Sequence, residues 1–186
     1  LKACFEALVR TGLDTNAALR VLRQLTLERL ARLDCARQAS LDSVTRSMTW
    51  LAEVTLDMAW QQVSADLDAL HGAPTKDGGQ RAEMWIIGMG KLGARELNVS
   101  SDIDLIFFYT HQGTLRFEQN GRDQTISFQE FFLRLARQLI SHLDDAGSID
   151  NVFRVDMRLR PYGDSGPLVV HRAAMEKYYL EQGRDW

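Results

Sequence analysis

The chain has 186 residues, enough for one large domain or two small ones with a substantial core. Its formal net charge is −3, so no strongly basic field favours non-specific binding to nucleic acid. No apolar run approaches the roughly 20 residues that a membrane-spanning helix needs, and no signal peptide is evident. These properties predict a cytoplasmic globular protein with neither nucleic acid nor membrane as a partner.

The ends of the chain and its cysteines add to this expectation. The chain starts without Met, inside a helix-like pattern, and stops at Trp186, which we interpret as a fragment of a longer cytoplasmic protein. The two cysteines, Cys4 and Cys35, lie far apart in helix-like patterns. We therefore expect both to be buried, reduced thiols.

The first 71 residues show the pattern of an all-helical region. They contain no proline and one glycine, and leucines recur at roughly helical spacing. A second helical pattern follows Ser40, the expected N-cap, with Asp42 in its first turn. We expect two long helices and part of a third, and then a linker at residues 71–79, which contain proline and several glycines.

The second half alternates between strand-like and helix-like patterns, which predicts an α+β fold with a small mixed sheet. A polar stretch between two such segments predicts a loop or hairpin at residues 111–125. Strands are expected at residues 83–88, 103–109 and 151–160, and helices at residues 128–143 and 173–182. The last strand would place its charged residues on one face and its apolar residues on the other.

Two aspartates mark the start of the second expected strand. Asp102 and Asp104 alternate with Ile103 and Leu105. Because a strand points successive side chains to opposite faces, the two carboxylates share one face while the apolar pair is buried on the other. Adjacent carboxylates repel each other unless a cation neutralises them or one binds a proton. The pair therefore predicts a cation site.

The segment just upstream is suited to binding phosphate. It contains Gly88, Gly90, Lys91, Ser100 and Ser101. Such a segment can bring backbone N–H groups, hydroxyls and one ammonium group up to phosphate oxygens. Metal-binding carboxylates beside a phosphate-binding loop indicate phosphoryl or nucleotidyl transfer.

Asp156, on the expected strand at residues 151–160, is the candidate for a third carboxylate. Three carboxylates suit two Mg²⁺ ions about 3.5–4 Å apart, the arrangement of two-metal phosphoryl chemistry. Arg158 and Arg160 would then point at phosphate or nucleotide. The alternative stays open that these arginines and Arg154 only solvate an exposed face or pair with Asp156.

Two separated blocks of sequence are similar to a known family. The first contains GMGKLG and SSDIDL, and the second is VDMRLRPYGDSGPL. Together they resemble the glutamine synthetase adenylyltransferase family, large bifunctional enzymes that add AMP to a tyrosine of glutamine synthetase and remove it. The resemblance implies a nucleotidyltransferase domain of the DNA polymerase β type at residues 80–186, preceded by a helical region at residues 1–72. The motif GMGKLG and the C-terminal sequence YYLEQGRDW resemble the N-terminal, adenylyl-removing half of these enzymes.

The resemblance also assigns roles. Asp102 and Asp104 match the metal-binding pair of the family, and Asp156 matches its third acid. The positions that match its phosphate-contacting loop are Gly88, Gly90, Lys91, Ser100 and Ser101. Two positions depart from the expected pattern: Ala94 replaces a glycine and Val99 replaces a phenylalanine. If the backbone at Ala94 needed a positive φ, the loop would be slightly rebuilt.

The activity that the resemblance implies is phosphorolysis of adenylylated tyrosine on glutamine synthetase, which gives ADP and needs two Mg²⁺ ions. A PII-type signal protein is then an expected partner of the full-length enzyme. One alternative is the opposite reaction, in which the adenylylating half transfers AMP from ATP. A second alternative is a non-catalytic module that binds nucleotide or a signal protein.

Overall fold

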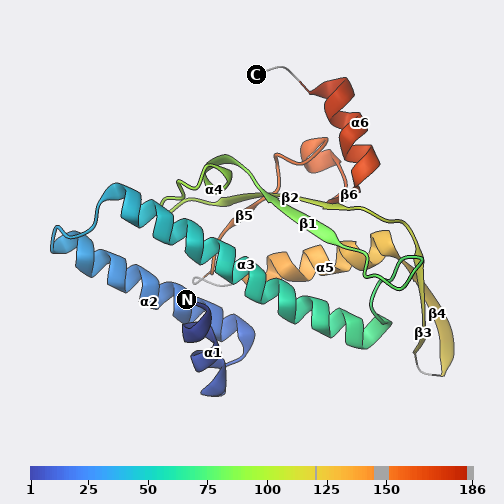
Figure 1. The fold of residues 1–186 in the computed structure, drawn as a ribbon, viewed down its shortest axis with the longest axis horizontal. Helices are drawn as coiled ribbons and strands as arrows, with labels where there is room; N and C mark the ends of the chain where they lie inside the picture. The colour runs from blue at the N-terminus through green and yellow to red at the C-terminus, as the bar shows by residue number, and fades with distance from the viewer. Residues whose placement is uncertain (120, 145–150, 184–186) are drawn as a thin grey trace. The chain divides into compact units, whose positions relative to one another are not determined.

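The structure is a computed structural model that describes residues 1–119, 121–144 and 151–183 (Figure 1). Its helices and small sheets confirm the α+β class that the sequence predicts. The chain forms two compact units whose segments alternate along the sequence. The first unit holds residues 1–62, 88–104 and 139–156, and the second holds residues 63–87, 105–138 and those from 157 onward.

The N-terminal part is helical, as predicted, with one short helix and two long ones. They are α1 (Lys2–Arg10), α2 (Thr15–Cys35) and α3 (Leu41–His71). Asp14 caps α2 by accepting a hydrogen bond from the Ala17 N–H at 2.7 Å. Ser40 does the same for α3, because its Oγ accepts from the Ser43 N–H at 3.2 Å, which confirms the expected N-cap. The division into a helical region 1–72 and a domain from residue 80 stays a prediction.

A small sheet is built around one central strand. Its order is β1-β2-β5, with β6 also paired to β2. The strands are β1 (Met84–Gly88), β2 (Ile103–Tyr109), β5 (Val155–Asp156) and β6 (Val169–His171). Both β5 and β6 run parallel to β2, β5 along its first two residues and β6 along its last three. The strands expected at residues 83–88 and 103–109 are therefore confirmed.

The remaining elements follow the predicted order. The polar stretch forms an antiparallel hairpin of β3 (Thr114–Gln119) and β4 (Arg122–Ser127). The expected helices are α5 (Phe128–Leu143) and α6 (Arg172–Gln182). Two short elements complete the fold: α4 (Gly90–Gly93) and the 3₁₀ turn η1 (Gly163–Ser165). Residues 184–186, the end of the YYLEQGRDW motif, lie outside the described residues.

The strand expected at residues 151–160 is wrong in length, because only Val155 and Asp156 are in a strand. Val152 and Phe153 are both buried although they are neighbours, so the expected two-face alternation fails at its start. After Asp156 the chain enters a turn, in which the Arg160 N–H donates to the Met157 carbonyl at 3.2 Å. These local partners replace those of a longer ladder.

The expectation of buried cysteines is also wrong, although both are free thiols. Cys4 and Cys35 are exposed. On α1 the buried position is Phe5, so Cys4 lies next to the inward-facing residue and not on it. Cys35 is the last residue of α2, where the helix leaves the packed region.

In the described ranges, no helix combines the length and the apolar character that crossing a membrane would require.

Candidate carboxylate and glycine-loop site

The glycine-containing segment at the end of β1 lies directly against Asp104, the aspartate within β2. Gly90 has φ +52°, and a Cβ placed on it would lie 2.6 Å from Asp104 Oδ2. The Met89 N–H donates to the Asp104 carbonyl at 2.8 Å, which holds the two backbones together. Only glycine satisfies both the left-handed backbone and the close approach. The juxtaposition of Gly90 with the carboxylate therefore agrees with the loop that the sequence indicates.

Two further glycines let this segment fold back on itself. A Cβ on Gly93 would lie 2.6 Å from the Gly88 carbonyl oxygen, and a Cβ on Gly88 would lie 2.9 Å from Leu92 Cγ. Leu92 is buried, so it anchors the short helix α4 while Lys91 beside it stays exposed. These contacts give Gly88 a packing reason, separate from any contact with phosphate.

The departure at Ala94 needs no rebuilding of the loop. Ala94 has φ −76°, an ordinary right-handed conformation, and the positive φ of +61° falls on Arg95. A non-glycine residue in this region stores about 1 kcal/mol of strain. Arg95 is held there by an ion pair from its Nη2 to Glu53 Oε1 at 3.0 Å.

The loop from residue 96 to residue 102 is anchored to α3 and to the segment before β5. The Leu97 N–H donates to Thr49 Oγ1 at 3.2 Å, and both residues are buried. The Ser101 N–H donates to the Asn98 carbonyl at 3.2 Å, and the Ser100 carbonyl accepts from Arg154 Nη2 at 3.2 Å. The two serines therefore lie in a fixed turn immediately before the aspartates.

The structure places two of the three predicted acids next to each other. Asp104 and Asp156 are register partners across the parallel pair β2 and β5. The Ile103 N–H donates to the Arg154 carbonyl at 2.9 Å and continues this ladder. Because neighbouring strands are about 4.8 Å apart and register partners share a face, the two carboxylates belong to one small area. The register therefore brings together one acid from each of the two separate sequence blocks.

Asp144 fixes the position of β5, and the sequence analysis did not single it out. Its Oδ2 accepts the Val155 N–H at 2.9 Å, and its Oδ1 accepts Asn151 Nδ2 at 2.8 Å. Asp144 directly follows the last residue of α5, so it is a polar residue at a helix end. An aspartate just after a predicted helix could have been noticed in the sequence, but the sequence does not indicate which backbone group it binds.

The third acid, Asp102, has an arginine partner. Arg154 Nε lies 2.6 Å from Asp102 Oδ1, so Arg154 forms an ion pair with Asp102. Asp102 Oδ1 is buried and, within the part of the chain that the structure describes, receives no hydrogen bond of good geometry. The contact is therefore an ion pair that leaves a buried oxygen poorly satisfied.

The donor set fits a divalent cation with oxygen ligands, although the three acids do not converge. Among the described residues, no group of three or more His, Cys, Asp and Glu side chains is arranged to hold a metal ion. Asp104 and Asp156 are adjacent carboxylates, which is the ligand type that Mg²⁺ takes. Asp102 would share its Oδ1 with such a cation only if Arg154, whose Nε lies 2.6 Å away, moved from that oxygen.

The predicted phosphate-binding cations have different surroundings. Lys91 is exposed and forms no ion pair within the described ranges. Arg160 uses Nη1 to donate to the Met157 carbonyl at 2.6 Å and lies 3.4 Å from Asp164 Oδ1. Arg158 and Arg160 belong to the second compact unit, whereas the acids belong to the first. Their role toward phosphate stays a prediction.

Comparison with known proteins gives the family. The family model described as glutamate-ammonia ligase adenylyltransferase matches residues 3–186. The chain belongs to this family. Among relatives called bifunctional glutamine synthetase adenylyltransferase/adenylyl-removing enzyme, that of Burkholderia mallei is 48% identical over 169 residues, or 91% of this chain. The relative from Nitrosococcus oceani is 47% identical over 184 residues, or 96% of this chain.

The match covers this chain almost completely but only part of each relative. The chain spans 18% of the length of the two relatives from Burkholderia mallei and Nitrosococcus oceani, and 18% of a third from Chromobacterium violaceum. Family membership is therefore shown, while the reactions in the relatives' name refer to much longer proteins.

Proposed function

We propose that this chain removes AMP from the adenylylated tyrosine of glutamine synthetase by phosphorolysis. Within the proposal, its described sheet and helices are those of a nucleotidyltransferase domain of the DNA polymerase β type. The carrying observation is the register of Asp104 and Asp156, which joins the two separated sequence blocks in one place. Family membership supports the chemistry, because the relatives' name includes both transfer and removal of adenylyl groups.

In the proposed reaction an oxygen of orthophosphate attacks the phosphorus of the AMP group. The bond from that phosphorus to the tyrosine oxygen breaks, the tyrosine oxygen takes a proton, and ADP leaves. Two Mg²⁺ ions, when bound, would neutralise negative charge on the attacking and leaving oxygens. The residues that would hold them are Asp104, Asp156 and Asp102.

The chain's own groups position the reactants in this proposal. The segment from Gly88 to Lys91 turns sharply beside Asp104, and its backbone N–H groups and the Lys91 ammonium would face phosphate oxygens. The Ser100 and Ser101 hydroxyls lie in the turn that leads into β2 and would do the same. Arg158 and Arg160 would supply fixed positive charge for an already anionic substrate.

The direct test is incubation with adenylylated glutamine synthetase, Mg²⁺ and phosphate, followed by detection of ADP. ADP that forms only when phosphate is present supports removal. A parallel reaction with unmodified glutamine synthetase and ATP reports the opposite direction through release of pyrophosphate. Pyrophosphate in that reaction, without ADP in the first, would contradict the proposed direction and favour the adenylylating half.

Binding of nucleotide with neither product would favour the non-catalytic module. A cytoplasmic location, and a PII-type signal protein as a partner of a longer protein, belong to the same proposal and rest on the resemblance alone.

A further inference from the structure

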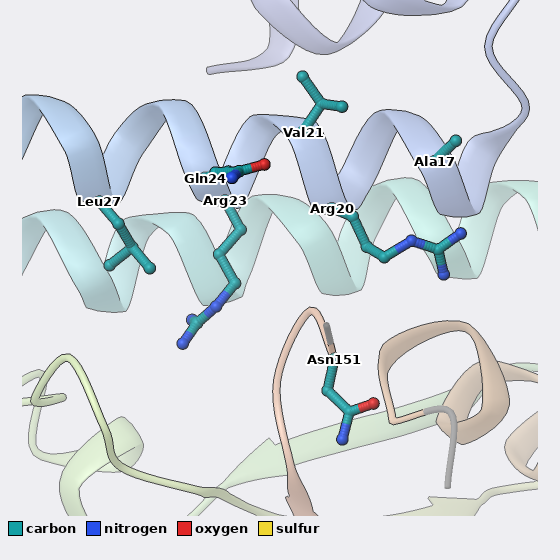
Figure 2. Close-up of a pocket in the computed structure, with 7 residues that line it drawn as sticks. All are labelled: Ala17, Arg20, Val21, Arg23, Gln24, Leu27 and Asn151. Carbon is teal, nitrogen blue, oxygen red and sulfur yellow. The ribbon is translucent and has the colours of Figure 1, made fainter. Parts of the chain in front are cut away.

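A pocket of about 490 Å³ lies on the side of α2 that faces the segment before β5 (Figure 2). Its volume falls within the range of small-molecule sites. Figure 2 shows the side chains of Arg20 and Arg23 leaving α2 toward the segment that carries Asn151. The pocket is lined by Ala17, Arg20, Val21, Arg23, Gln24, Leu27 and Asn151.

Among the described residues, the lining carries two positive charges and no negative charge. Arg20 is half-buried, and in the described part of the chain it makes no ion pair and no hydrogen bond. Arg23 is also half-buried and is not paired with any described carboxylate. Two guanidinium groups at the wall of one pocket attract an anion and repel a cation.

Arg23 is held in place, yet its hydrogen-bonding capacity is not used up. Its Nη2 donates to the Val99 carbonyl at 3.3 Å, and its guanidinium lies 4.7 Å from the centre of the Phe153 ring. Its Nη1 is buried without a hydrogen-bond partner among the described residues. Burial lowers the pKa of Arg23, because desolvation disfavours its charged form.

Asn151 offers the opposite function on the facing wall. Its Nδ2 donates to Asp144 Oδ1 at 2.8 Å, which fixes the orientation of the amide because the carboxylate can only accept. Its Oδ1 is then left buried, with no donor among the described residues. A buried carbonyl oxygen in this state favours a ligand that brings an N–H or O–H group.

We propose that this pocket binds a small organic anion that carries, besides its carboxylate or phosphate, a hydroxyl or amino donor. The anionic group is bound by Arg20 and Arg23, and the donor is bound by Asn151 Oδ1. Both unpartnered atoms belong to residues that line the pocket, so a ligand there would supply the partners that they lack.

A second pocket in the same compact unit provides a contrast. It is lined by Asp42, Arg46, Ser47, Trp50, Ala94, Arg95 and Glu96. Its cations are already neutralised, since Arg46 pairs with Asp42 at 3.1 Å and Arg95 pairs with Glu53 at 3.0 Å. Among the described residues, Arg20 and Arg23 therefore differ from the arginines of this second pocket in having no carboxylate partner.

The walls of the proposed site are bonded to the backbone on both sides of the aspartates. Arg23 holds the carbonyl of Val99, three residues before Asp102. Asn151 is bonded to Asp144, which holds the N–H of Val155, the neighbour of Asp156. A ligand that binds Arg23 or Asn151 therefore changes the hydrogen bonds that position the carboxylate segment. The NMR signals of the backbone amides near Val99 and Val155 should report this change.

The test is an NMR titration of the ¹⁵N-labelled chain with two matched pairs of probes. Malate and succinate differ by one hydroxyl, and glycerol 3-phosphate and methyl phosphate differ by two hydroxyls and their carbon frame, so each pair tests the donor. The pairs also distinguish a carboxylate from a phosphate. We expect at least one hydroxylated probe to shift the Arg20 and Arg23 side-chain signals and the Val99 and Val155 amides. Its matched partner without the hydroxyl should bind about tenfold more weakly.

Two variants on the same helix provide the control. Arg20→Gln keeps a polar, helix-compatible side chain but shortens it and removes its charge, and it should weaken binding of the hydroxylated probe about tenfold. Arg29→Gln changes an exposed arginine outside the pocket and should change binding less than twofold.

Three outcomes would overturn the proposal. The first is that no hydroxylated probe binds below roughly 10 mM. The second is equal weakening by the Arg20 and Arg29 variants, which would mean non-specific attraction to a basic helix. The third is equal binding within both probe pairs, which would show that Asn151 accepts nothing from the ligand.

Discussion

The segment 103–109 is apolar apart from Asp104, whereas the segment 151–160 alternates polar and apolar residues; both patterns predict strands, but the two segments form different structures. The first is a strand along its whole length, with β1, β5 and β6 as partners. The second contains only two strand residues, Val155 and Asp156. In the second segment the Val155 N–H is bound by the Asp144 carboxylate, and a turn closes between Met157 and Arg160.

The difference shows that alternation specifies the faces of a segment but not the length of its ladder. A strand extends only as far as neighbouring backbone is present to receive its N–H and carbonyl groups. Where side chains and turns bind those backbone groups instead, the segment alternates in sequence but does not pair as a strand. Asp104 lies in the continuous strand and Asp156 in the short one, so the two acids depend on different supports.

The largest effect is expected for Asp104→Asn, which tests the acid in the continuous strand. The amide keeps the volume but loses the charge, so the rate of AMP removal should fall about a hundredfold or more. Unfolding free energy without metal should stay the same or rise by a few tenths of a kcal/mol, because one like charge beside Asp156 is removed. ADP production and denaturant unfolding measure the two quantities. Asp123→Asn, at an exposed position of β4, is the control, and a near wild-type rate for Asp104→Asn would reject its assignment.

Gly90→Ala tests the contact between the glycine segment and the same strand. The substitution adds left-handed strain of about 1 kcal/mol and an overlap with Asp104 Oδ2 that costs about 1–3 kcal/mol more. Gly72→Ala is the matched control, because Gly72 also has a positive φ, of +79°, but has no atom within 4 Å of the added Cβ. Urea unfolding of both variants gives the comparison. Equal losses of stability would show that the contact with Asp104 has no energetic weight.

Asp156→Ala tests whether the short strand contributes to a metal site. At roughly a hundred times its Kd, Mg²⁺ or Mn²⁺ should raise the Tm of the wild-type chain by about 5–10 °C. The Asp156→Ala chain should show less than about half of that shift, since one of two register-paired ligands is lost. Thermal unfolding with and without metal measures both chains, with Asp123→Ala as the control. Equal shifts in all three would place Asp156 outside any metal site.

The smallest effect is expected for Arg154→Gln, which removes the ion pair that joins the two segments at Asp102. With the Arg154 and Asp102 side chains 65% and 40% exposed, the pair should contribute less than about 1 kcal/mol to stability. Denaturant unfolding at low salt checks this value, and Arg32→Gln, which breaks an exposed pair within α2, is the reference. A loss above about 2 kcal/mol would mean that Arg154 orders β5 rather than merely pairing with an acid.

Much of the fold could be predicted because its signals are local. The strand at residues 103–109, the helix at residues 128–143 and the Ser40 cap each depend on neighbours within one turn or one pleat. The cysteines were misjudged because helical periodicity does not identify which of two adjacent residues faces inward. Phe5 occupies the buried position beside Cys4.

The candidate site was predicted as a set of residues but not as a geometry. The proximity of Gly90 to Asp104, and the pairing of Asp104 with Asp156, follow the expected juxtaposition. The partner of Asp102 could not be derived from the sequence. Arg154, Arg158 and Arg160 all fall on the same face of the expected strand, and the sequence does not show that the strand ends at Asp156, after the first of them. Asp144 and the pocket on α2 depend on side-chain contacts between distant segments, and no local pattern records these.

The ion pair between Arg154 and Asp102 has a consequence for ionic strength. A cation that binds Asp102 through Oδ1 displaces a guanidinium whose Nε lies 2.6 Å from that oxygen. Dissolved salt weakens the attraction of the incoming cation, but it also weakens the exposed pair that the cation replaces. The two effects oppose each other, so Arg154 acts as a built-in counterion that flattens the salt dependence of cation binding. In the Arg154→Gln chain only the first effect remains, and binding should fall more steeply as salt is added.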